Sequence, residues 1–174
     1  MLNLIRDNKE NGATVKVAEG NYLGYMNAGY MEIHNWITLE GGCSPDFSQR
    51  NPLKFITRIE PDQSHKGTNG SKGLITLSKL DDVLSNKIHG TVTIDGFMLN
   101  MGYGYEFMTA VNADVHHNIF LCNSYSALAR THVLSGPDAP IEAKRVTNIY
   151  DNAFFMNAAD LQLCKWKRTG TAFV

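Results

Sequence analysis

The chain has 174 residues, of which 43% are apolar and 19% are charged, and its formal net charge is −1. This length and composition fit one globular domain spanning residues 1–174 and exclude a disordered chain. Nucleic acid is not expected as a partner, because positive charge is not concentrated in any one stretch. No apolar run reaches the roughly 20 residues that a membrane span requires.

The chain opens with a short apolar segment at residues 2–5, followed by a polar run that ends at Gly12. This is the pattern of a helix C-terminus. Strand-like runs then begin at residues 14, 36, 55, 74, 92, 115 and 149. Most steps are near 20 residues, and the last is lengthened by a Pro- and Gly-rich loop at 135–140. Even spacing without helical segments leaves a sandwich, a barrel or a parallel β-helix of about seven coils.

A repeat favours the β-helix. Two segments place an apolar residue, Asn, Phe and Asn at the same offsets, and an earlier segment is a partial copy with Asp at the first Asn position. In stacked coils, equivalent residues lie about 4.8 Å apart, so Asn amides can form hydrogen-bonded ladders and Phe rings can stack. The three copies are Val115, Asn118, Phe120, Asn123; Ile149, Asn152, Phe154, Asn157; and Val92, Asp95, Phe97, Asn100.

Two motifs carry a family resemblance. Residues 12–22 (GATVKVAEGNY) resemble the opening coil of the pectin-lyase-like superfamily. Residues 41–52 (GGCSPDFSQRNP) are similar to a stretch common in secreted or surface bacterial β-helix repeat proteins. The resemblance implies an all-β, right-handed parallel β-helix with an N-terminal helical cap, of which Leu2 to Arg6 would be a remnant. Within the second motif, Asp46 and Arg50 are expected to form an ion pair that holds a long loop.

The resemblance also implies a secreted or cell-surface location, although the chain shows no signal peptide. Enzymes on this scaffold are mostly polysaccharide lyases and glycoside hydrolases. One hypothesis is therefore a protein that binds, or also cleaves, polysaccharide. A second is a structural or adhesive, self-assembling module without catalysis, and a third is a phage tailspike-like receptor-binding segment. The apolar, uncapped ending at 169–174 predicts self-association or a covering partner for a segment of a longer solenoid.

A lyase needs a base and a cation beside the sugar carboxylate. The candidates are His117 as the base and Arg130 and Arg145 as cations. In a strand, His116 and His117 would point to opposite faces, so only one of them could face a groove. The alternative is an exposed His beside a hydrogen-bonded turn His. Whether the chain is an enzyme stays open until these groups are shown to converge.

Two further sets of residues suggest binding. Trp166 is a candidate sugar-stacking platform, with Lys165 and Arg168 as contacts for an acidic glycan; the alternative is a set of solvated charges. Asp95 and Asp151 lie near equivalent turns and are candidate ligands for Ca²⁺, the one cofactor that the sequence suggests. They could equally be turn residues that bond their own backbone.

Overall fold

The computed structural model of the chain describes a set of ranges, and every structural statement below concerns them. Within these ranges the secondary structure is all strand, without a helix; in particular, no helix there is long and apolar enough to cross a membrane. The helical cap expected at 2–6 and the loop expected at 135–140 lie outside the described residues. The described ranges are 12–24, 31–33, 36–61, 75–77, 90–100, 107–109, 112–122, 128–133, 146–158, 161–166 and 172–173.

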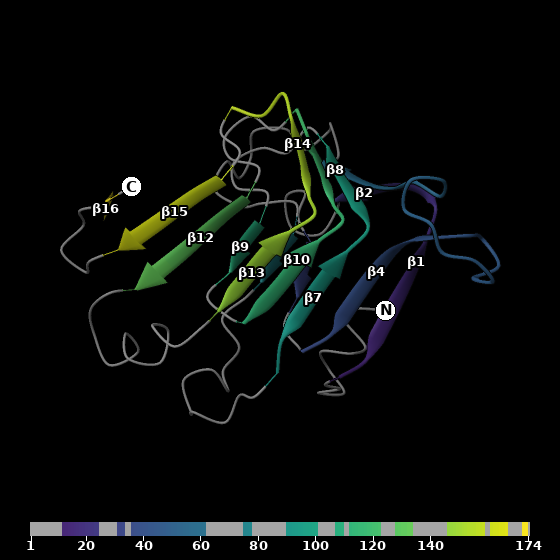
Figure 1. Ribbon diagram of the computed structural model, residues 1–174, viewed down its shortest axis with the longest axis horizontal. Helices are drawn as coiled ribbons and strands as arrows, with labels where there is room; N and C mark the ends of the chain where they lie inside the picture. Colours follow the sequence, from purple (N-terminus) through teal and green to yellow (C-terminus); the bar gives the residue numbers. More distant parts are fainter. Residues whose placement is uncertain are drawn as a thin grey trace.

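The described strands form three sheets, and the chain visits the sheets in a fixed order (Figure 1). In the first sheet all neighbours are parallel, in the order β1-β4-β7-β10-β13. Parallel neighbours separated by other strands require the chain to travel around and return to the same side. The strands of the first sheet are β1 (Thr14–Ala18), β4 (Thr38–Cys43), β7 (Val92–Asp95), β10 (Ala113–His116) and β13 (Thr147–Tyr150).

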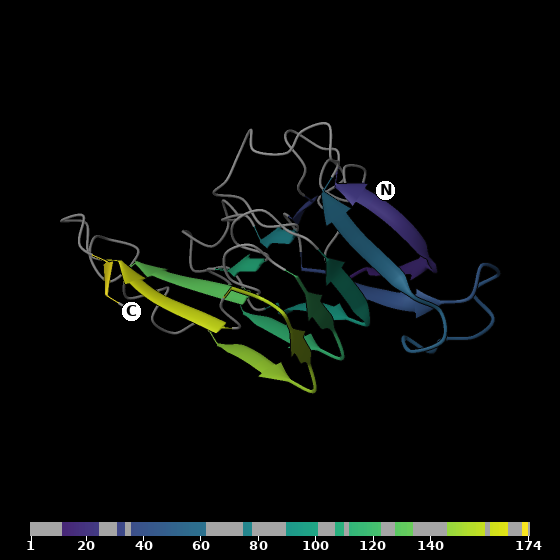
Figure 2. The same cartoon turned by 90° about the horizontal axis from the view of Figure 1, so that it is seen from above.

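The second sheet contains the strand that follows each of these along the chain, again with parallel neighbours. Figure 2 shows that most strands of the first sheet meet their successor at a sharp bend, which recurs along the molecule, whereas a long loop joins β4 to β5. The strands of the second sheet are β2 (Gly20–Gly24), β5 (Thr57–Pro61), β8 (Phe97–Asn100), β11 (Ile119–Leu121) and β14 (Ala153–Phe155).

The third sheet contains the third strand of each pass, where a pass is one run of the chain through the first, second and third sheets. Its pairs are parallel except for the last, in which β16 runs antiparallel to β15. The described residues therefore make five successive passes through the three sheets. The strands of the third sheet are β3 (Met31–Ile33), β6 (Ile75–Leu77), β9 (Phe107–Thr109), β12 (Leu128–Val133), β15 (Leu161–Trp166) and β16 (Ala172–Phe173).

The seven strand-like runs of the sequence are not seven equivalent coils. The runs that begin at 36, 55 and 74 lie in the first, second and third sheets of a single pass. In the first sheet Val15 pairs with Leu39, Leu39 with Ile94, Ile94 with Val115, and Val115 with Ile149. The intervals are thus 24, 55, 21 and 34 residues. A spacing near 20 residues therefore has two origins. It separates successive strands within a long pass, and it separates equivalent strands of adjacent passes where the pass is short.

The hydrophobic core lies between the three sheets. Alternate residues of the inner strands β5, β7, β8, β10 and β11 are buried, and Ile33 and Ile75 of the third sheet join the same cluster. This alternation follows from the period of two along a strand, which turns every second side chain inward. The largest fully buried side chains are Phe97, Phe120, Ile37, Leu39, Ile59, Ile75, Ile94 and Leu99.

The predicted ladder and ring stack are confirmed for the two complete copies of the repeat. Asn118 Nδ2 donates to Asn152 Oδ1 at 3.1 Å, and the rings of Phe120 and Phe154 stack at 5.0 Å with an interplanar angle of 7°. The third copy, however, lies two residues out of the expected register. Phe120 pairs with Leu99, so Phe97 takes the place that precedes β11, where its backbone N–H donates to Asn118 Oδ1 at 3.0 Å.

We predict that Asn118→Ala destabilises the fold by about 3 kcal/mol, because its buried amide also donates to the carbonyls of Ile94 and His116. The control is Asn148→Ala, an exposed Asn whose amide donates to Asp114 Oδ1; it should change stability by less than about 0.5 kcal/mol. Urea unfolding of both variants measures the difference. Equal losses would show that the Asn ladder is not a special source of stability.

Candidate functional site

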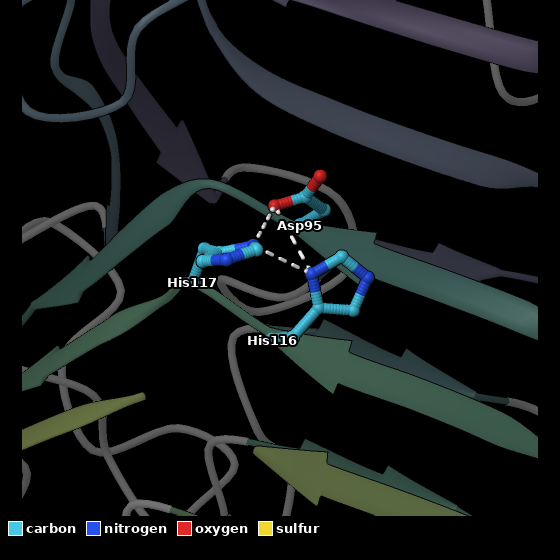
Figure 3. A group of neighbouring side chains, drawn as sticks. All are labelled: Asp95, His116 and His117. Atoms are coloured by element: carbon cyan, nitrogen blue, oxygen red, sulfur yellow. Dashed lines mark hydrogen bonds and ion pairs between the residues drawn. The ribbon is translucent and has the colours of Figure 1, made fainter. Parts of the chain in front are cut away.

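A cluster of one carboxylate and two imidazoles lies where the first sheet bends into the second. Asp95 ends β7, His116 ends β10, and the two residues are paired in register; His117 follows directly. Figure 3 shows the two rings and the carboxylate converging. Asp95 Oδ1 lies 3.2 Å from His117 Nδ1 and 3.4 Å from His116 Nδ1, and the two Nδ1 atoms are 2.8 Å apart.

The expectation that His116 and His117 point to opposite faces is wrong. Their rings make an edge-to-face contact, with centroids 4.8 Å apart. The reason is the backbone: His117 lies beyond the end of the strand with φ of 53°, a left-handed conformation that breaks the strand alternation. Gly96 and Asp151 hold the same position in the neighbouring passes, with φ of 82° and 51°.

Arg50 holds the other oxygen of the carboxylate. Its Nη2 lies 2.6 Å from Asp95 Oδ2, and the Asp95 side chain is only 10% exposed. Arg50 Nε also donates to the Gly41 carbonyl at 3.0 Å, which fixes the guanidinium against the bend. A charge-assisted pair that is largely shielded from water fixes the orientation of the carboxylate, and Oδ1 is thereby presented to the imidazoles.

The ion pair expected between Arg50 and Asp46 is therefore not the one that forms. Asp46 Oδ1 instead accepts hydrogen bonds from Ser44 Oγ at 2.6 Å and from the N–H and Oγ of Ser48. These bonds, first that from Ser44, lower the pKa of Asp46 to about 2. Local hydrogen bonds from Ser44 and Ser48 thus hold the loop, and the Arg50 side chain instead contacts Asp95 in the next pass.

Glycine at position 96 makes this crossing feasible. A Cβ there would lie 2.8 Å from both Arg50 Nη2 and Pro52 Cγ. The left-handed φ of Gly96 also disfavours any residue with a side chain. The absence of a side chain at this one position lets the guanidinium reach Asp95 from the loop 43–56.

The rim of the cluster is aromatic and acidic. The Tyr150 ring stacks on His116, with centroids 4.7 Å apart, and the residue is 46% exposed. Asp151 Oδ2 lies 3.9 Å from His117 Nε2. The pKa of Tyr150 is raised above its usual value of 10, first by desolvation and then by the negative charges of Asp114, Asp95 and Asp151.

The structure brings together four of the residues singled out in the sequence: Asp95, His116, His117 and Asp151. Arg130 lies on β12 and Lys165 and Trp166 on β15, all in the third sheet, while Arg145 and Arg168 lie outside the described residues. Among the described residues, the cation that contacts the cluster is Arg50, through Asp95. Sequence reasoning assigned Arg50 to a loop contact and did not foresee the contact of Tyr150 with His116. Each contact joins residues of two different passes, so predicting it requires the strand register between those passes.

This arrangement is suited to two kinds of chemistry. An imidazole that is oriented by a buried carboxylate and is 55% exposed at its side chain can act as a general base. Two imidazole nitrogens facing one carboxylate oxygen can also hold a metal ion. An all-oxygen calcium site is less favoured, because His117 lies between Asp95 and Asp151.

We predict that Tyr150 titrates above pH 10 and that Asp114→Asn moves its midpoint toward 10, because one negative neighbour is removed. Since the folded-state pKa exceeds the unfolded value, folding stability should fall as the pH rises above about 10, and less so in the variant. Phenolate absorbance, with Tyr150→Phe to identify the signal, measures the midpoint. An unchanged midpoint in Asp114→Asn would contradict the electrostatic cause.

No family model, curated protein or solved structure matches the chain.

Proposed function

We propose that this chain is a segment of a right-handed parallel β-helix of the secreted or cell-surface, pectin-lyase-like kind, and that it binds polysaccharide at the bend between the first and second sheets. The recurring order of three sheets with parallel pairing supports the β-helix. The two sequence motifs at 12–22 and 41–52 support the superfamily. The location and the ligand follow from that resemblance together with the chemistry of the bend.

One observation supports sugar binding above the others: an exposed aromatic ring lies among exposed planar polar groups. Tyr150 is 46% exposed, and the side chains of His117 and Asp151 are 55% and 69% exposed. A phenol ring offers an apolar face that can pack against the C–H groups of a sugar. The imidazole and the carboxylate offer the donors and acceptors that sugar hydroxyls need.

The charge of the bend favours a neutral polysaccharide. Asp95, Asp114 and Asp151 all act on Tyr150, and the nearby cation, Arg50, is already paired with Asp95. A uronate carboxylate would therefore meet net repulsion at this surface. The acidic glycan suggested by Lys165, Trp166 and Arg168 would need a different site, and the first two of these residues lie on β15 of the third sheet.

Cleavage is an extension of the same proposal. His117 would serve as the base, Asp95 would orient it, and Asp151 would be the second carboxylate near the sugar. Incubation with neutral and acidic polysaccharides distinguishes binding from cleavage. New reducing ends without unsaturated products would indicate hydrolysis, and reducing ends together with unsaturated products would indicate elimination. Binding without either product would leave a binding module.

We predict that Tyr150→Ala weakens binding to a neutral polysaccharide by about tenfold or more, the loss typical of removing a central aromatic contact. Tyr22→Ala is the matched control, because Tyr22 is 37% exposed but lies on β2 in the first pass, whereas Tyr150 lies on β13 in the last described pass. Affinity electrophoresis across a panel of glycans measures both variants. Equal effects of the two substitutions, or no binding by the unaltered chain, would refute a sugar site at Tyr150.

A second candidate is self-assembly, and the last pass favours it. Ile149 and Phe154 are only partly buried, whereas their partners Val115 and Phe120 in the preceding pass are fully buried. Within the described part of the chain, β13 and β14 each form one edge of their sheet. A second copy of the chain could extend both edges and cover these side chains.

We predict that the chain associates in a concentration-dependent manner and that the double substitution Phe155→Lys and Met156→Lys prevents association, because charges at an edge strand block pairing. Both residues are exposed, at 61% and 72%. The control is Leu53→Lys, at an 81% exposed apolar residue of the loop 43–56. Light scattering after size-exclusion chromatography gives the mass. A monomer at every concentration would exclude this candidate.

A further inference from the structure

We propose that Asp95, His116 and His117 form a binding site for a transition-metal ion of the Zn²⁺ class. This triad is defined by one donor atom from each residue: Asp95 Oδ1, His116 Nδ1 and His117 Nδ1. The proposal does not depend on polysaccharide binding. It rests on the distances between the three donor atoms, on the contacts that orient their side chains, and on their chemical identity as two nitrogens and one oxygen.

The spacing of the triad matches one face of a coordination shell. Its three edges are 2.8, 3.2 and 3.4 Å. At metal–ligand distances of about 2.0–2.1 Å, neighbouring donors lie about 2.9 Å apart in an octahedron and about 3.3 Å apart in a tetrahedron. A triangle with the observed edges has its centre about 1.8 Å from each corner, so an ion at bonding distance would lie about 0.9 Å out of the plane.

Each ligand is already oriented by a neighbour. Arg50 binds Asp95 Oδ2, so only Oδ1 faces the triad. The His116 ring is stacked between the edge of His117 and the face of Tyr150. His117 Nε2 faces the Asp151 carboxylate at 3.9 Å. A carboxylate near the second nitrogen of a ligating imidazole is the usual outer-shell arrangement, because it favours the tautomer with a free Nδ1 lone pair.

The donor set selects the class of metal. Two imidazole nitrogens and one carboxylate oxygen suit Zn²⁺, Co²⁺, Ni²⁺ or Cu²⁺, whereas Ca²⁺ and Mg²⁺ prefer oxygen ligands. The His117 side chain is 55% exposed, so an ion can enter from solvent and can keep water as a further ligand. The alternative is that a proton, shared among three close lone pairs, holds the cluster together.

The test is metal binding by the full chain, prepared without a histidine tag and treated with a chelator. We expect one equivalent of Zn²⁺ to bind, measured by calorimetry, and Co²⁺ to give visible absorption with nitrogen ligands. The key variant is His117→Gly, since glycine suits the left-handed backbone there, as Gly96 does in the neighbouring pass. The variant should therefore fold, but its affinity should fall at least about 100-fold, beyond the loss typical of an outer-shell partner.

His132→Ala is the control for the other histidines, because His132 lies on β12 in the third sheet. It should bind Zn²⁺ as the unaltered chain does. Zn²⁺ should also raise the melting temperature of the unaltered chain and of His132→Ala, but not that of His117→Gly. Equal affinities of His117→Gly and the unaltered chain, or no stoichiometric binding by either, would overturn the proposal and leave the shared proton.

Discussion

The bend between the first and second sheets is the constraint on which the rest of the described structure depends. At each pass the chain must change direction there without leaving buried backbone groups unpaired. Thr57, Asn118 and Asn152 meet this requirement with side chains that bond the backbone of the preceding pass, and Thr57 also accepts from Gly42 in its own pass. The residue before each of the two asparagines adopts a left-handed backbone. That conformation directs the His117 side chain toward Asp95 and His116. The candidate site therefore results from the backbone conformation that the bend requires.

The sequence repeat was sufficient to predict parallel strands, the Asn ladder and the stacked Phe rings, because side chains at equivalent places must fit one another. It was not sufficient to count the passes or to align the third copy. A run of four apolar and polar residues looks the same in any of the three sheets, and loops of unequal length hide the period. Asp95, His117 and Asp151 could be named from residue type and turn context. The partnership of Arg50 with Asp95 could not, because it joins residues 45 positions apart through a folded loop.

His117 takes part in both proposals, but its proton is on a different ring nitrogen in each. If its Nδ1 atom binds a metal ion, the proton must reside on Nε2, which then faces Asp151 as a donor. The ring would in that state help to bind sugar hydroxyls but could not accept a proton from a substrate. Without the ion, Nδ1 can donate to Asp95, and Nε2 becomes the free base. Metal occupancy would thus decide between a binding role and a catalytic role for the same side chain.

The strand pairing has a consequence for how the molecule comes apart. Every described strand of the first two sheets pairs only with its counterparts in the passes immediately before and after it. Each pass is therefore stabilised mainly by its contacts with the passes directly before and after it. Thermal opening should start where a pass has a single neighbour among the described strands, at β1 and β2 or at β13 and β14, and advance inward. The amides of β7 and β8, with neighbours on both sides, would then be the last to exchange with solvent.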